Sequence, residues 1–190
     1  FLGNKSGTAV TTGADNTFVG SEAGISNTTG GTNVALGKDA MRSNTTASNN
    51  TAVGHEAGQA NTTGAQNTFL GRKAGRGVTT GSENTFVGNS AGRDGTVTGS
   101  YNIGLGSVTL NALTSGSNNI AIGRDALGAN TTASNNTAVG YQAATLNTTG
   151  QRIVAIGKGA LYTHNVTDAS STNNVSVGYE SSYSTTTGTD

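Results

Sequence analysis

The sequence predicts an all-β protein, specifically a parallel β-solenoid (β-roll) built from about eleven copies of one 17-residue coil. Three observations predict this class. A glycine follows a short apolar run at a nearly constant interval along the whole chain. The residues before that glycine are rich in β-branched side chains, which favour extended strands. No copy has the 3.6-residue periodicity of an amphipathic helix, and a fixed short period is typical of stacked repeats.

The glycine column defines the repeat. Most of its steps have the same 17-residue length, the step from Gly88 to Gly106 is one residue longer, and the step from Gly157 to Gly178 is four residues longer. A register kept over so many copies indicates identical units that stack on one another. The column consists of Gly3, Gly20, Gly37, Gly54, Gly71, Gly88, Gly106, Gly123, Gly140, Gly157 and Gly178.

Three columns precede each glycine. The first, from Leu2 to Val177, is branched aliphatic, and the column two residues earlier, from Thr17 to Val175, is β-branched. Because they are two residues apart, both point to one side of a strand, which we expect to be the coil interior. The column between them is Phe or Ala in most copies, so we expect it to form an interface with another copy of the chain. These candidate interface residues are Phe1, Phe18, Ala35, Ala52, Phe69, Phe86, Ala121, Ala138 and Ala155.

The remaining positions of the repeat are polar. Asn stands four residues before most glycines, and stacked Asn side chains can form amide ladders. Charged residues follow the glycine at an exposed corner, a short second strand begins after them, and an Asn-Thr-Thr-Gly turn closes many coils. We expect one array over residues 1–190. Both ends fall inside a repeat, so the polypeptide should continue in both directions. The longest interruption, near 162–173, should form a loop.

Composition and charge exclude several classes of function. Ten basic residues balance ten acidic ones, which gives no electrostatic basis for binding nucleic acid. No apolar run has the length of a membrane span, so we expect no membrane insertion by this segment. The chain has no Cys, and its two His residues, His55 and His164, are far apart in the repeat array. We therefore expect no catalytic residues, no metal site and no cofactor, and predict that the chain is not an enzyme.

The core unit resembles the head repeat of trimeric autotransporter adhesins, a type also found in bacteriophage tail fibres. The resemblance rests on runs such as Asn-Ile-Ala-Ile-Gly-Arg-Asp-Ala at 119–126 and Asn-Thr-Ala-Val-Gly-Tyr-Gln-Ala at 136–143. It implies a left-handed parallel β-roll, three chains around one axis, and an extracellular location on a bacterial cell surface or a virion tail. The strand often carries Thr where the adhesin motif prefers Val, and the 17-residue period is unusually constant.

These observations favour a structural fibre or adhesin segment that attaches to a host or other surface. Its partners would be further copies of itself and a host glycan or protein. Candidate receptor contacts gather toward the C-terminal end, where aromatic residues are concentrated: Tyr141, Tyr162, His164, Tyr179 and Tyr183. Two alternatives remain. One is a purely structural extracellular filament, and the other is an ice-binding solenoid that uses the recurring Thr-Thr pair of the turn.

Overall fold

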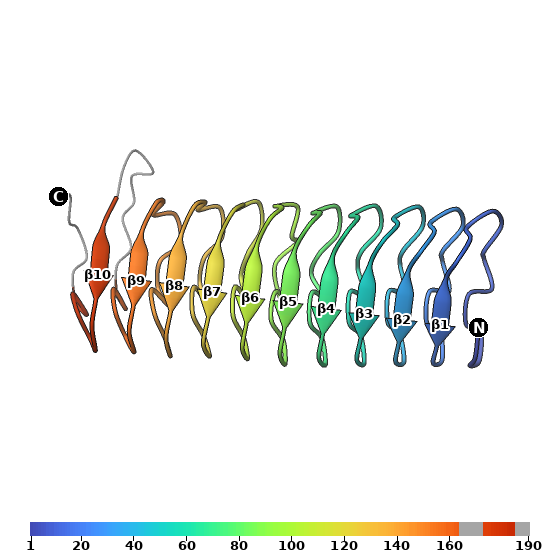
Figure 1. Ribbon diagram of the computed structural model, residues 1–190, viewed down its shortest axis with the longest axis horizontal. Helices are drawn as coiled ribbons and strands as arrows, with labels where there is room; N and C mark the ends of the chain where they lie inside the picture. Colours follow the sequence, from blue (N-terminus) through green and yellow to red (C-terminus); the bar gives the residue numbers. More distant parts are fainter. Residues whose placement is uncertain (164–172, 185–190) are drawn as a thin grey trace.

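The computed structural model describes residues 1–163 and 173–184 and confirms the predicted parallel β-solenoid. Ten three-residue strands form one parallel sheet in chain order, so each coil of the rod contributes one rung (Figure 1). The strands are β1 (Thr17–Val19), β2 (Val34–Leu36), β3 (Thr51–Val53), β4 (Thr68–Leu70), β5 (Thr85–Val87), β6 (Ile103–Leu105), β7 (Ile120–Ile122), β8 (Thr137–Val139), β9 (Val154–Ile156) and β10 (Val175–Val177).

The register of the sheet follows the repeat even where the repeat is interrupted. The extra residue between β5 and β6 leaves Thr85 paired with Ile103, and the longer step between β9 and β10 leaves Val154 paired with Val175. An isolated bridge from Leu2 to Val19 adds one further rung before β1. Most of the expected loop, residues 164–172, lies outside the described part of the chain.

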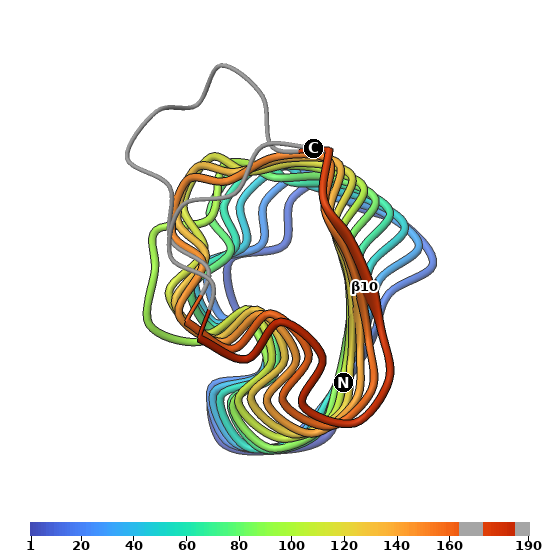
Figure 2. The ribbon, with the colours of Figure 1, turned by 90° about the vertical axis from the view of Figure 1, so that its left-hand side faces the viewer.

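The second strand that we expected in each coil does not form in the described residues. The segment after each corner glycine is a series of turns instead, and it zigzags along the wall opposite the sheet (Figure 2). Its backbone turns sharply because two positions per coil adopt left-handed conformations. Glu22 has a φ of 58° and Leu127 a φ of 49°, for example. The segment still bonds from coil to coil, as from Gly24 N–H to Ala40 O, but its left-handed positions are not β geometry, so the sheet occupies one side of the coil only.

The two faces of the strand are the reverse of what the sequence led us to expect. The middle residue of every strand is buried, while the two flanking residues are exposed or half-buried. Phe69, for instance, has none of its surface exposed, whereas its neighbour Leu70 is 47% exposed. The Phe and Ala column therefore fills the interior of its own coil, and the aliphatic column points outward.

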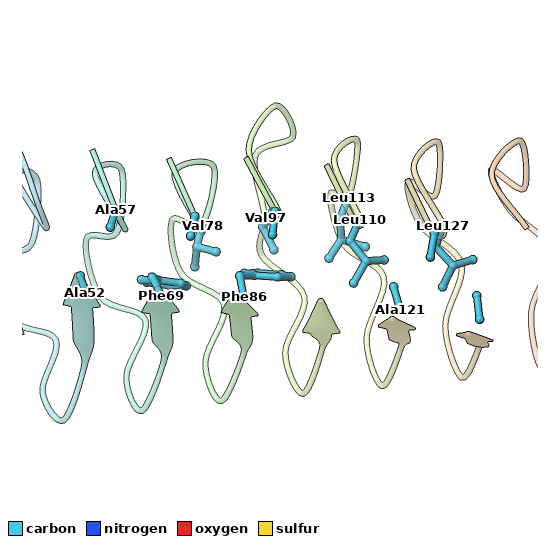
Figure 3. Packing of buried hydrophobic residues seen from close by; sticks show 14 of the residues in the cluster. Ala52, Ala57, Phe69, Val78, Phe86, Val97, Leu110, Leu113, Ala121 and Leu127 are labelled. Atoms are coloured by element: carbon cyan, nitrogen blue, oxygen red, sulfur yellow. The ribbon is translucent and has the colours of Figure 1, made fainter. Parts of the chain in front are cut away.

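Side-chain sizes on the two walls of the interior compensate for each other. A Phe on the strand faces a Gly six residues later, as in Phe18 with Gly24 and Phe86 with Gly92; a Cβ atom at Gly92 would lie 2.8 Å from the ring of Phe86. In several coils with a small strand residue the same later position is large, as in Ala121 with Leu127. Figure 3 shows the rings of Phe69 and Phe86 on the strand side and the aliphatic side chains of the opposite wall across from them. In these coils the narrow interior holds one large side chain from one wall or the other.

Asparagine ladders connect the coils, as the sequence predicted. The side-chain Oδ1 of Asn67 accepts a hydrogen bond of 2.9 Å from the backbone N–H of Asn84. In the same way, Asn50 Oδ1 accepts from the backbone N–H of Asn67. The side chains also bond directly, from Asn84 Nδ2 to Asn67 Oδ1 at 3.2 Å. Ile153 interrupts the column, yet its N–H still donates to Asn136 Oδ1. The ladder therefore satisfies buried backbone donors where the chain approaches each strand.

The corner glycine is required by both conformation and space. Gly54 has a φ of +135°, and a Cβ atom there would lie 2.5 Å from the carbonyl oxygen of Gly71 in the next coil. Side chains are excluded because successive coils come into backbone contact at this column.

Candidate functional surfaces

The outward side of the sheet is an apolar surface that we call the outer strand face. It consists of the first and third residues of β1 to β10, together with Leu2. None of these side chains is charged, and none is fully buried. Its aliphatic column contains Leu2, Val19, Leu36, Val53, Leu70, Val87, Leu105, Ile122, Val139, Ile156 and Val177. Single exposed aliphatic residues are ordinary, but a continuous apolar stripe marks an interaction surface.

The shape of the outer strand face suits a partner with the same repeat. The strand side is the straightest part of the coil outline when the rod is viewed along its axis (Figure 2). Ten rungs spaced about 4.8 Å apart give the face a length of about 43 Å. The first residue of each strand is Thr, Val or Ile, whereas the third is always aliphatic. Hydroxyl groups therefore occur along only one edge of the outer strand face.

The candidate trimer-interface residues taken from the sequence do not lie on this face. Phe18, Ala35, Ala52, Phe69, Phe86, Ala121, Ala138 and Ala155 have no exposed surface, so in this fold they cannot contact another chain. Phe1 is 64% exposed and stacks on Phe18 in the first coil, with ring centroids 5.1 Å apart. The prediction of which column faces the interior was wrong. Both faces of the strand are apolar, so the alternation of residues does not show which face is inside.

The corner after each strand is polar in the N-terminal coils, and its charges pair between coils. Arg42 Nε lies 2.8 Å from Glu22 Oε2 in the preceding coil. Glu56 pairs with Lys73 and Arg76 of the next coil at 3.7 and 3.1 Å. Such exposed pairs contribute little stability, but they neutralise the charge of this surface locally.

The same corner changes character in the C-terminal coils, where cations alternate with tyrosines. The residue after the glycine is Arg124, Tyr141, Lys158 and Tyr179 in the four coils of β7 to β10, and we call this set the corner ladder. The Arg124 guanidinium carbon lies 5.7 Å from the ring centroid of Tyr141, and Lys158 Nζ lies 4.9 Å from that of Tyr179. All four side chains are exposed.

Lys158 also donates a hydrogen bond of 3.2 Å to the hydroxyl oxygen of Tyr179. This hydrogen bond with Tyr179 is the main cause that raises the pKa of Lys158 above its usual value. Glu180 lies 3.8 Å from Lys158 and pairs with it across an exposed surface.

The other candidate receptor contacts divide into two groups. The rings of Tyr162 and Tyr183 stack with centroids 4.8 Å apart and an interplanar angle of 2°. Tyr183 also lies against Gly159, where a Cβ atom would be 3.2 Å from its ring. His164 lies outside the described residues. The sequence placed Tyr141 and Tyr179 at an exposed corner and the structure agrees, but their cationic neighbours become apparent only when the coils are stacked.

The Thr-Thr turn column, the basis of the ice-binding alternative, is used in part by the fold itself. The first hydroxyl of each pair donates to a carbonyl of the next coil, for example from Thr28 to Thr45 at 3.0 Å and from Thr45 to Thr62 at 3.1 Å. The second Thr of these pairs, such as Thr29, is exposed. In the pairs at 28–29 and 45–46, the first hydroxyl is therefore used between coils and the second lies at the surface.

The described residues contain no group of three or more His, Asp or Glu side chains that could hold a metal ion. His55 is half-exposed and lies 3.5 Å from Glu56. Across residues 1–163 and 173–184, no helix has the length and apolar character needed to cross a membrane.

Fold and surface together define the chain as a parallel β-solenoid repeat protein with one apolar face and one polar corner. Comparison with protein families, curated proteins and solved structures gives no match for the chain.

Proposed function

We propose that this chain is a non-enzymatic segment of an extracellular fibre or adhesin, which assembles as a homotrimer and attaches to a host or other surface. One observation carries the proposal: an uncharged aliphatic column runs along the outside of the sheet through every described coil. A solvated rod has no physical reason to keep branched aliphatic residues at this position in each repeat. A partner that covers the column supplies one.

Further copies of the same chain are the best partners for this face. Another copy has the same spacing between rungs, so each side chain meets an equivalent site along the whole length. Residues such as Leu70 and Ile122, 47% and 37% exposed, would each contribute on the order of 1 kcal/mol when covered. Summed over ten coils, this is of the size that a stable assembly requires. The number of three chains rests on the resemblance to adhesin head repeats.

An attachment role is supported by the surfaces that the outer strand face leaves free. The interior and the Asn ladders fix most positions of each coil, whereas the corners differ in charge and aromatic content from one end of the rod to the other. A rigid rod with variable corners suits recognition of a surface at several points. Such a segment would be displayed on a bacterial cell or a virion tail.

Analytical ultracentrifugation tests the assembly. The unmodified chain should sediment as a trimer at micromolar concentration. The variant Leu70→Asp/Ile122→Asp should remain folded, by its circular dichroism, but sediment as a monomer, because each new carboxylate would be buried between chains. Thr63→Asp/Thr132→Asp is the matched control, because both threonines are exposed in the turn column. A folded monomer for the unmodified chain would refute the trimer.

Two further assays separate the alternatives. Binding to host envelopes or immobilised glycans distinguishes an adhesin from a purely structural filament, which would assemble but bind nothing. Inhibition of ice recrystallisation would favour the ice-binding alternative, and replacing the exposed Thr29, Thr46 and Thr63 by Ala should then abolish it.

A further inference from the structure

We propose that the corner ladder binds a linear acidic polysaccharide, laid along the axis of the solenoid with its sugar rings on Tyr141 and Tyr179 and its carboxylates at Arg124 and Lys158. This inference rests on the proposed attachment function and names the chemical class of the ligand. The ladder occupies the corner of the coils that carry β7 to β10, toward the C-terminal end of the rod in Figure 1.

The spacing of the ladder matches an extended glycan. Successive coils are about 4.8 Å apart, so the two tyrosines, separated by one coil, are about 10 Å apart. The two cations are separated by the same distance because they alternate with the tyrosines. One sugar ring in an extended chain is close in length to one such rung of about 5 Å. A linear polysaccharide would therefore meet a tyrosine at every second ring and a cation between them.

The chemistry of the four side chains fits acidic sugars. A tyrosine ring offers a flat apolar surface to the C–H face of a sugar, and its hydroxyl remains free to bond a neighbouring group. Arg124 and Lys158 each lie over one face of a tyrosine ring, so a sugar would stack on the opposite face with the cation beside it. Charge-assisted hydrogen bonds from these cations to carboxylates are stronger than bonds to neutral hydroxyls.

The acidic neighbours leave this positive charge available. Glu180 is 3.8 Å from Lys158, and both side chains are about half exposed, so the pair is weak and a ligand carboxylate can compete with it. Asp125 follows Arg124 in sequence, but its carboxylate lies against Gly128 of its own coil. Within the described residues Arg124 makes no ion pair.

The N-terminal coils provide an internal comparison on the same scaffold. Their corner column carries Lys38, His55 and Arg72, with no tyrosine. Lys38 pairs with Asp39 beside it. Arg72 is exposed and occupies the same corner position as Arg124, but no tyrosine follows it in this column. Replacing Arg72 therefore removes a corner charge without removing a tyrosine neighbour.

A second pair of tyrosine rings lies near the ladder. Gly159 follows Lys158, and the stacked rings of Tyr162 and Tyr183 lie beyond it in the same two coils. A Cβ atom at Gly159 would lie 3.2 Å from both Glu180 Cγ and the ring of Tyr183, so Glu180 lies between the ladder and the stacked rings.

The test uses the unmodified oligomer and four probes in isothermal titration calorimetry. The acidic probes are oligomannuronate, oligogalacturonate and polysialic acid, and the neutral probe is the methyl ester of the oligomannuronate. At least one acidic probe should bind, and esterification should weaken oligomannuronate binding about tenfold or more if that probe binds. Tyr141→Ser/Tyr179→Ser should reduce the affinity for a binding probe about tenfold or more, and Arg124→Gln/Lys158→Gln should remove the preference for the acid.

The control variant His55→Ser/Arg72→Gln should bind as the unmodified chain does. No binding of any acidic probe, or equal losses in the control and the ladder variants, would overturn the inference. Sedimentation of the same samples keeps the two proposals separate. A trimer that binds no acidic glycan refutes the ligand only, whereas a glycan-binding monomer refutes the assembly only.

Discussion

Exchanging the large and small residues of one coil tests which side of the strand is the interior. In the coil of β5, Phe86 fills the space beside Gly92. In the coil of β7 the order is reversed, with Ala121 on the strand and Leu127 on the opposite wall, and both are fully buried. The double variant Phe86→Ala/Gly92→Leu therefore rebuilds one coil in the arrangement that another coil already has.

The magnitudes predict strong coupling between the two sites. Phe86→Ala alone should lower the free energy of unfolding by about 3–5 kcal/mol, the usual cost of a buried Phe. Gly92→Leu alone should cost about 2–5 kcal/mol, from overpacking against the ring and from a left-handed backbone, since Gly92 has a φ of +61°. The double variant keeps that backbone strain but fills the cavity, so it should lose only about 2–3 kcal/mol. A coupling energy of at least about 2 kcal/mol follows.

Guanidinium unfolding followed by circular dichroism measures all four proteins, at one protein concentration because assembly contributes to stability. Strain at the Leu is tolerable, since Leu127 adopts a φ of 49° at the equivalent position. The reasoning fails if the two single effects simply add. It also fails if Phe86→Ala changes only the sedimentation and leaves the unfolding midpoint of the separated chains unchanged, because Phe86 would then face outward.

Two other changes test the connections between coils, and a third tests an ion pair within one coil. Asn67→Ala should lower the free energy of unfolding by about 1–3 kcal/mol, because a buried backbone N–H loses its acceptor. The control is Asn4→Ala, at an exposed Asn outside the left-handed region, and equal losses would contradict the ladder. Gly54→Ala should cost more than about 3 kcal/mol through backbone overlap, and an unchanged melting temperature would contradict the close approach. The hydrogen bond from Arg93 lowers the pKa of Asp94, so its stabilising effect is present above about pH 4 and is lost as the pH falls through the lowered pKa. Stability should therefore decline more between pH 5 and pH 2 in the unmodified chain than in Asp94→Asn, and identical acid profiles would contradict this.

The period of the sequence was enough to predict the solenoid, its parallel sheet and the Asn ladders. It did not identify the interior face, because the aliphatic and the Phe/Ala columns are both apolar and alternate along the strand. A signal that distinguishes them is present in the sequence. Phe on the strand is followed six residues later by Gly, and Ala is often followed there by Met or Leu, as in Ala35 with Met41. Two columns that exchange volume in this way must share one enclosed space.

The candidate contact residues were predictable only in part. Exposed tyrosines at a corner follow from the repeat, since the position after the glycine carries polar residues in other coils. The alternation of cations and rings is not visible in the linear sequence, because Tyr141 and Lys158 are one full repeat apart in the chain and become neighbours only through stacking. The turns of the opposite wall were also missed, since left-handed positions there carry Glu, Leu and other ordinary residues.

The sequential order of the sheet has a mechanical consequence when the rod is under tension. Hydrogen bonds between coils run along the rod axis, and each coil is bonded only to the coils before and after it. Tension between the two ends therefore acts on the terminal coil first, and that coil can peel away while the others remain intact. Each released 17-residue coil adds a contour length of about 55–60 Å. A fibre built in this way would lengthen in equal steps under a pulling force and dissipate energy at each step, instead of breaking at a single point.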